Sequence, residues 1–259
     1  MGRPPHERLN RMSSIGRPVG GRAPRPPGQE DVSESTPQPA SRSQRTSRGA
    51  ITRERILVEA SRLFAVRGYF GTSTRDIAEA VGLKQPSLFF HFATKQVIAE
   101  DLLSYSLVKP TAAARELLRG VEPASVRLYR YLLFDTQHLL QSPYDLTGVH
   151  GDDLMNAPEF QVWRKKAQKL RRDIQQMLRQ GQDDGSLRVV DVILTQELIS
   201  GMNLNTIRMA HSEKRKRTSH VPQLVADFTL RALLADVGAL DAAREAALEG
   251  LSGLLSPQR

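Results

Sequence analysis

The sequence contains no cysteine, only one tryptophan and no long uninterrupted apolar run. The absence of cysteine excludes a disulfide framework, a thiolate zinc site and a cysteine nucleophile. A membrane-spanning helix needs about 20 consecutive apolar residues, so we expect neither a transmembrane segment nor a membrane partner. The N-terminus is basic but has no apolar stretch, which argues against a secretory signal. These absences together predict a cytoplasmic protein.

The motifs of common enzyme classes are also missing. The sequence has no phosphate-binding glycine loop, no GxSxG elbow and no HExxH pair. Its 6 histidines are scattered without the spacing of metal ligands. We therefore predict a protein that is not an enzyme and has no cofactor and no metal site. An enzyme that used dispersed residues of a helical domain would escape this test.

The charge is distributed unevenly along the chain. The sequence has 37 basic and 28 acidic residues, a net charge of +9, and its first 48 residues are rich in Arg, Pro, Gly and Ser. Because this segment has no aromatic residue and no periodic apolar face, we predict that residues 1–48 form a disordered basic arm. The arm is either an inert leader or a DNA contact, with arginines on phosphates or in a minor groove.

A helical pattern begins after residue 50. Ile56, Ala60 and Phe64 repeat at helical spacing. Thr52 is a suitable N-cap and Gly68 a suitable C-terminal glycine. These signals predict a first helix over residues 53–67.

The next stretch has the pattern of a helix-turn-helix. Ser73 and Asp76 have the spacing of a capping box, and Gly82 supplies a tight turn. Pro86 suits the first turn of a second helix, which in this motif places its N-terminal side chains against base edges in the major groove. Thr94 is the predicted cap of a further helix.

Three segments of this region resemble the TetR family of bacterial regulators: AVRGYFG at 65–71, TSTRDIAEAVG at 72–82 and SLFFHFATK at 87–95. The resemblance covers about 45 residues in order and implies a DNA-binding domain over residues 49–96. It also implies a nucleoid-associated regulator with double-stranded DNA as its partner. The positions that match the family's DNA contacts are Thr74, Arg75, Lys84, Gln85, Ser87, Phe89, His91 and Lys95.

The resemblance also implies what these side chains do. Thr74 and Arg75 approach phosphates, whereas Lys84, Gln85 and Ser87 open the recognition helix. Gln85 suits a bidentate contact to adenine. His91 and Lys95 contact the DNA backbone. The positive N-terminus of its own helix assists Lys95 in binding a phosphate. For His91, a role in capping or bridging helices stays open.

Two positions depart from the family's pattern. Phe89 stands where the family usually has a tyrosine that binds a phosphate, so one hydrogen bond is lost. Pro86 stands where a small residue is common. Both departures make the operator of any known relative a poor guide to the operator of this chain. Phe90 and Phe92 are expected to pack in the core.

The rest of the chain keeps helical patterns. Pro110 is expected to end or bend the fourth helix. Residues 158–181 form an amphipathic pattern that Gly181 closes. The segment after Asp191 is apolar on more than one side, so this helix is buried deeply or shared with a second subunit. The basic cluster at 213–217 is interpreted as a solvated loop.

No segment alternates as a strand would, so we predict an all-α fold. An N-terminal three-helix domain is followed by a helical effector-binding and dimerisation domain at 97–238 and a helical tail at 239–259. Similarity to the TetR family implies a homodimer that binds a palindromic site, with its recognition helices about 34 Å apart.

The resemblance further implies a pocket for a small-molecule effector in the second domain. Asp135 and His138, three residues apart, either orient a polar ligand group or form a solvent-facing pair of little energetic value. Each candidate lining residue has core packing as its alternative role. These candidates are Leu103, Tyr105, Tyr129, Phe134, His138, Trp163 and Met202.

The predicted function is that of a ligand-responsive repressor, in which the effector changes the separation of the recognition helices. Two alternatives remain. One is a DNA-binding architectural or partner-binding factor that uses its helical domain only for association. The other is activation of transcription, since the sign of regulation depends on where the operator lies relative to the promoter.

Overall fold

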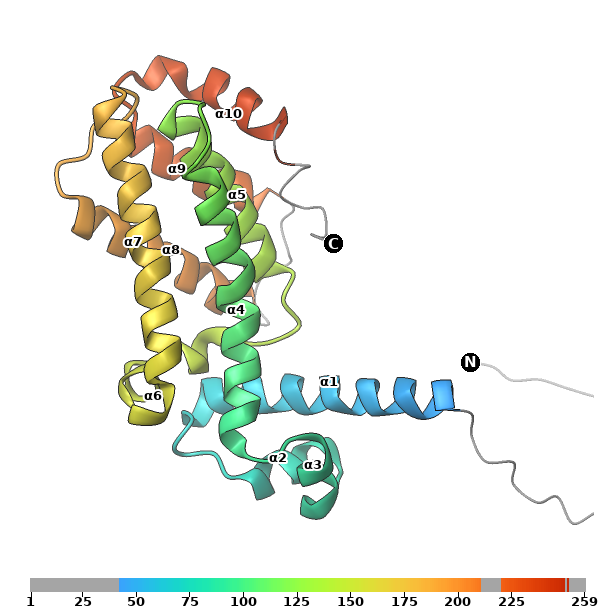
Figure 1. Ribbon diagram of the computed structural model, residues 1–259. Coiled ribbons are helices and arrows are strands. Elements are labelled where there is room, and N and C mark those ends of the chain that lie inside the picture. Colours follow the sequence, from blue (N-terminus) through green and yellow to red (C-terminus); the bar gives the residue numbers. More distant parts are fainter. Residues whose placement is uncertain (1–41, 211–219, 250, 252–259) are drawn as a thin grey trace, which may run out of the picture. The chain divides into compact units, whose positions relative to one another are not determined.

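The structure is a computed structural model that describes residues 42–210, 220–249 and 251 (Figure 1). The helical segments of this part are α1 (Arg42–Arg67), α2 (Thr74–Val81), α3 (Gln85–His91), α4 (Lys95–Leu117), α5 (Ala124–Leu140), α6 (Asp152–Asn156), α7 (Gln161–Asp183), α8 (Val192–Ala210), α9 (Val221–Leu233) and α10 (Leu240–Glu249), with short 3-10 turns η1 (Leu146–Val149), η2 (Pro158–Phe160) and η3 (Val237–Ala239). The described residues contain no strand, only an isolated bridge between Leu187 and Leu234. The all-α prediction is therefore confirmed. No described helix has the length and apolar character that crossing a membrane requires.

The first helix starts earlier than its cap signal predicts. α1 begins at Arg42 and passes through Thr52, so the expected start at residue 53 is wrong. No proline lies between Arg42 and the end of α1, and nothing else in that stretch stops a helix from extending toward the N-terminus. Residues 42–48, which were assigned to the arm, are thus helical. Residues 1–41 lie outside the described part, and the domain limits remain predictions.

Two later helices extend past the residues at which they could have ended; for Pro110 only the ending is contradicted, and the bend stays a prediction. α4 continues through Pro110 to Leu117, because the proline removes one backbone hydrogen bond while Ala113, Ala114 and Leu117 remain buried beyond it. α7 runs past Gly181 to Asp183, and the turn is made by Gly185, whose φ of 74° is in the left-handed region. The basic cluster at 213–217 lies outside the described residues.

The described helices enclose two apolar cores, and α4 takes part in both. The first core joins α1, α2 and α3 to η1, α6 and the N-terminal halves of α4 and α7. The second joins α5, α8, α9 and α10 to the C-terminal halves of α4 and α7. Ile98 and Leu102 of α4 belong to the first core, and Ala114 and Leu117 to the second. α4 is thus the continuous element between the helix-turn-helix and the C-terminal bundle.

The start of α5 is capped from a distant part of the chain. Pro123, its N-cap residue, makes no side-chain cap hydrogen bond. Instead, the N–H of Ala124 donates to Asp184 Oδ2 at 2.7 Å, and the N–H of Ser125 donates to Ser186 Oγ at 3.2 Å. The turn between α7 and α8 therefore satisfies helix donors that would otherwise be unpaired.

The turn η1 lies directly against α1 through Gly148. A Cβ atom at this glycine would lie 2.3 Å from the backbone carbonyl carbon of Phe64. The Tyr144 hydroxyl, just before η1, donates to both carboxylate oxygens of Glu54 in α1, at 2.9 and 2.8 Å. The loop after α5 and the first helix are therefore tightly packed against each other.

Gly148→Ala is expected to lower the free energy of unfolding by about 2 kcal/mol, because the α1 backbone cannot move aside as a flexible side chain would. Chemical denaturation of the variant and the wild type measures this difference. Gly49→Ala in α1 is the matched control, since a Cβ there meets nothing within 4 Å. Equal losses for both substitutions would contradict the close approach of η1 and α1.

Candidate nucleic-acid interface

The helix-turn-helix is formed by α2 and α3, and its local signals act as the sequence predicts. The Asp76 N–H donates to Ser73 Oγ at 3.1 Å, and the Ser73 N–H donates back to Asp76 Oδ2 at 2.8 Å. Gly82 ends α2 with a φ of 74°, and Pro86 lies in the first turn of α3. The capping hydrogen bonds from Ser73 lower the pKa of the Asp76 carboxyl, and the nearby Arg67 acts in the same direction. Asp76 therefore stays ionised and keeps the cap in place.

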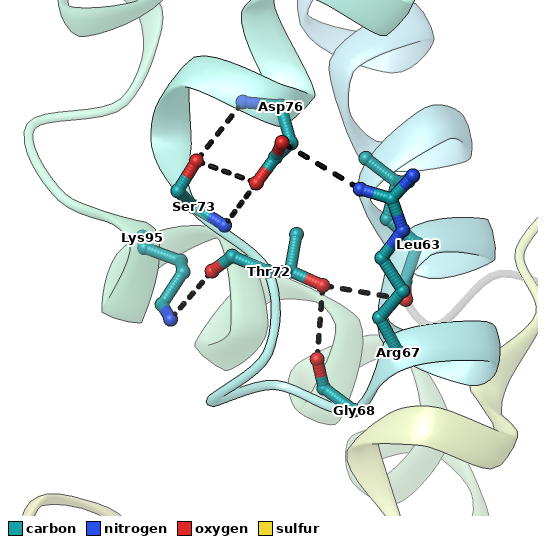
Figure 2. A network of polar contacts seen from close by, with 7 residues as sticks. All are labelled: Leu63, Arg67, Gly68, Thr72, Ser73, Asp76 and Lys95. Carbon is teal, nitrogen blue, oxygen red and sulfur yellow. Dashed lines mark hydrogen bonds and ion pairs between the residues drawn. The ribbon is translucent and has the colours of Figure 1, made fainter.

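Polar contacts tie the connection between α1 and α2 to both neighbouring helices (Figure 2). The hydroxyl of Thr72 donates to the carbonyls of Leu63 and Gly68, at 3.3 and 2.9 Å. An ion pair of 3.5 Å joins Arg67 of α1 to Asp76 of α2. The direction in which α2 leaves α1 is thus fixed by several independent bonds.

Lys95, the first residue of α4, completes this network. Its Nζ donates to the carbonyls of Tyr69 and Thr72, each at 2.7 Å, and lies 4.1 Å from the centroid of the Tyr69 ring. Partial burial lowers the pKa of the ammonium group. The side chain that resembles a phosphate contact of the family therefore fixes the loop 69–72 to α4 inside this chain.

The remaining predicted contact residues lie on or near the outer surface of the motif. Thr74 and His91 are partly buried, whereas Arg75, Lys84, Gln85, Ser87 and Phe89 are exposed. The amide Nε2 of Gln85 donates to the Thr74 hydroxyl at 2.9 Å, so these two side chains are in contact across the motif. The contacts of these residues with DNA remain predictions.

Phe90 corrects the sequence analysis. Phe92 is buried as predicted, but the side chain of Phe90 is 87% exposed, so its assignment to the core is wrong. In α3 the buried anchor is Leu88, and a residue two positions away on a helix points to the opposite side. This spacing from Leu88 was the signal in the sequence that identifies Phe90 as an outward residue.

The seven effector-pocket candidates do not form one group. The rings of Tyr105 and His138 stack with centroids 4.7 Å apart, and the ring of Phe134 is stacked with that of His138 at 6.1 Å. The Tyr129 hydroxyl instead donates to Asp227 Oδ1 at 2.5 Å, between α5 and α9. The other candidates are divided between the cores: Leu103 and Trp163 pack in the first, and Met202 against the second.

The predicted pair of His138 and Asp135 is not solvent-facing. The carboxylate of Asp135 is buried and accepts a hydrogen bond of 2.6 Å from the Asn203 amide. His138 Nε2 lies 2.9 Å from the Tyr105 carbonyl oxygen. Burial lowers the pKa of this histidine. The two side chains therefore have separate partners inside the protein.

A cavity of about 630 Å³ opens elsewhere, between the α4–α5 connection and the α7–α8 turn. It is lined by Glu122, Arg127, Asp183 and Asp184, among others, and by none of the seven candidates. Arg127 is bound within the chain, to Gln180 Oε1 at 2.6 Å and to the Leu117 carbonyl at 3.1 Å. Its guanidinium group therefore serves to join α4, α5 and α7.

A capped helix-turn-helix with an exposed recognition helix, joined to a helical bundle, defines a DNA-binding transcription regulator. The family model for bacterial regulatory proteins of the tetR family matches residues 56–102. The transcriptional repressor KstR2 of Mycolicibacterium smegmatis is 28% identical over 173 residues, which cover 62% of this chain and 80% of that protein. Residues 56–102 thus match the TetR family, and the likeness to a repressor of this kind extends over 62% of the chain.

Solved structures agree with this assignment. AmtR of Mycobacterium smegmatis is 26% identical, with a TM-score of 0.67 over 77% of this chain and 94% of that chain. AibR in complex with isovaleryl coenzyme A and operator DNA is 20% identical, with a TM-score of 0.54 over 71% of this chain and 98% of that chain. The second likeness concerns the fold alone.

Proposed function

We propose that the protein is a repressor that binds a palindromic operator as a homodimer and releases it when a small molecule binds. The observation that carries this proposal is an apolar surface that α8 and α9 leave uncovered. In α8, Leu194 and Leu198 lie one turn apart, and in α9 Leu224 and Phe228 have the same spacing. The members of this surface are Ile193, Leu194, Leu198, Met209, Leu224 and Phe228, all exposed in the single chain.

An exposed apolar surface of this kind is expected to bind a partner. Leu198 is 61% exposed and Phe228 is 67% exposed, although both are large apolar side chains of regular helices. Grouped apolar exposure on a helical face marks an interaction site. A second copy of the chain supplies an apolar surface of the same kind, and two-fold pairing places two recognition helices on two half-sites of one palindrome.

The release step needs a connection between the bundle and the helix-turn-helix, and α4 supplies one. It carries Lys95 against the loop 69–72 at one end and Leu117 in the second core at the other. Tyr105 of α4 stacks on His138 of α5 between these ends. The hydroxyl of Thr111 in α4 is buried without a partner in the described part of the chain. A ligand that engages these groups acts directly on the helix that holds the motif.

One relative supports repression as the direction of regulation, and one fold neighbour shows that this fold accommodates a small molecule. KstR2 is described as a transcriptional repressor, and AibR is described in complex with both a coenzyme A ester and operator DNA. The chemical identity of the effector of this chain is left to experiment, because the candidate residues Tyr105, Phe134 and His138 are aromatic and compatible with many ligands.

The test is selection of the purified protein on a library of randomised DNA duplexes, followed by affinity measurements on the enriched sequence. We expect an inverted repeat with half-site centres about one helical turn apart. The affinity of the protein for the enriched duplex should be at least about 1000-fold higher than its affinity for random DNA. Binding that is indifferent to sequence would instead support an architectural factor that uses the helical domain only for association.

Phe228→Asp is expected to convert the dimer to monomers, because a carboxylate on the apolar surface loses solvation on association. Operator affinity should fall about 100-fold with it, since each half-site is then bound separately. Analytical ultracentrifugation and DNA titration measure both effects. Val162→Asp is the matched control, a residue of α7 that is 62% exposed. If both variants sediment alike, the α8–α9 surface is not the dimer interface.

A further inference from the structure

The outward face of the recognition helix is apolar at its centre. An α-helix turns about 100° per residue, so side chains two positions before and after a buried residue point away from the core. In α3 the buried residue is Leu88, and the two positions are Pro86 and Phe90. Both are exposed. The neighbouring Phe89, at 44% exposure, is half as accessible as Phe90 at 87%.

Nothing in the described part of the chain covers Phe90. Its one ring contact is with the adjacent His91, edge to face with centroids 5.4 Å apart. Burying a phenylalanine side chain is favourable by about 2 kcal/mol. A partner that covers the exposed Phe90 therefore gains up to this much binding free energy. One turn before it lie Pro86 and the polar Ser87, and the exposed Gln85 and Lys84 stand at the start of the same helix. The apolar centre therefore lies inside the surface predicted to meet DNA.

Major-groove chemistry identifies what such a centre recognises. The base edges in this groove present hydrogen-bond donors, hydrogen-bond acceptors and one apolar group, the C5-methyl of thymine. Phe90 and Pro86 have no side-chain donor or acceptor and cannot read the polar pattern. We propose that Phe90, supported by Pro86, contacts the methyl group of a thymine in each half-site and so determines the base at that position. This inference rests on the proposed function, which places α3 in the major groove.

Two features favour DNA over a second protein as the occupant. Phe90 and Pro86 lie on the short helix that Gln85 begins and Lys84 precedes, and these two residues resemble the family's DNA contacts. The neighbouring exposed charges on the motif's outer surface include Lys84 and Arg75, which suit phosphates rather than an apolar protein surface. The proposed dimer surface, on α8 and α9, involves different helices.

The test replaces thymidine by deoxyuridine, which removes only the methyl group. The selected operator is synthesised with this replacement at one symmetric pair of positions at a time, and each duplex is titrated with wild type and with Phe90→Ala. For the wild type we expect a loss of about fourfold per methyl group at one position of each half-site, or about 15-fold for the pair. Phe90→Ala should bind the thymine and uracil duplexes with equal affinity.

A control variant and a folding check keep the result specific. Val66→Ala removes another apolar side chain of the DNA-binding domain, 83% exposed at the end of α1, and should keep the full sensitivity to uracil. The exposed position of Phe90 predicts an unchanged melting temperature for its alanine variant.

The possible failures are distinguishable. Sequence-specific binding that no uracil replacement weakens would overturn the inference and leave the proposed function intact. So would a Phe90→Ala variant that remains sensitive at the same position, or one that changes only the association state of the free protein. Absence of any selected sequence would overturn the proposed function itself.

Discussion

Lys95→Met is expected to weaken operator binding about tenfold while leaving the salt dependence of the affinity unchanged. The family resemblance makes this residue a phosphate contact, whereas the structure gives its ammonium group two carbonyl partners at 2.7 Å within the chain. A lost phosphate contact lowers the slope of log affinity against log salt by about 0.9. A lost positioning contact moves α2 and α3 relative to α4 and lowers the affinity at every salt concentration. The slope therefore separates the two roles.

Lys84→Met is the matched control for this prediction. Lys84 is the exposed N-cap residue of α3 and makes no side-chain cap hydrogen bond. Its replacement should reduce the slope by about 0.9 for each half-site without altering stability. A similar reduction of the slope in Lys95→Met would contradict the positioning role.

Stability gives a second, independent readout. Methionine leaves the carbonyls of Tyr69 and Thr72 without their shared donor, and Thr72 is a buried residue. We expect Lys95→Met to lower the free energy of unfolding by about 2 kcal/mol, since hydrogen bonds to charged groups contribute more than neutral ones. Denaturation of the free protein measures this loss. A phosphate contact alone would leave the free protein as stable as the wild type.

The sequence predicted those parts of the motif that local chemistry determines. The reciprocal cap of Ser73 and Asp76, the left-handed glycines at 68 and 82 and the buried Phe92 all follow from residue type and spacing, and all are confirmed. Family resemblance extended this to a set of DNA contacts. The bonds of those residues to DNA, and the effector pocket, remain predictions.

What the sequence did not predict depends on contacts between distant segments. Asp184 caps α5 from sixty residues away, and Lys95 binds carbonyls of the loop before α2. Backbone carbonyls carry no side-chain signal, so such partners appear only when the chain is folded. The prediction for Phe90 was wrong for a different reason. Aromatic residues usually pack in a core, and the prediction followed this general preference instead of the two-residue spacing of Phe90 from the buried Leu88.

The free energy of unfolding is expected to contain a term that decreases as the pH rises, and Asp135 is its source. Burial raises the pKa of this carboxyl from 3.8 to about 7, although hydrogen bonds from Tyr131 and Asn203 oppose the shift. The folded state therefore holds the proton more tightly than the unfolded state does. Between the two pKa values folding takes up a proton, so stability is present in full below about pH 4 and is lost as the pH rises toward 7.

Asp135→Asn is expected to remove this term, because asparagine has nearly the same volume, accepts the bond from Asn203 and carries no charge. A shift from 3.8 to about 7 corresponds to about 4 kcal/mol, which is the largest gain expected for the variant above pH 7. Below pH 4 the two proteins should be equally stable. Denaturant titrations from pH 4 to 8, at one protein concentration because dimerisation adds to stability, measure the difference.

The outcome also bears on how α5 and α8 are held together. Asn203 of α8 donates to Asp135 and accepts from the hydroxyl of Thr136, so this buried group joins α5 to the helix that carries four of the six residues of the proposed dimer surface. A buried, ionised Asp135 costs solvation free energy that the bond from Asn203 offsets only in part, so the asparagine variant should dimerise at pH 8 at least as tightly as the wild type. Parallel stability curves for the two proteins across this range would show that the carboxyl does not titrate on unfolding, and would contradict a buried, protonated Asp135.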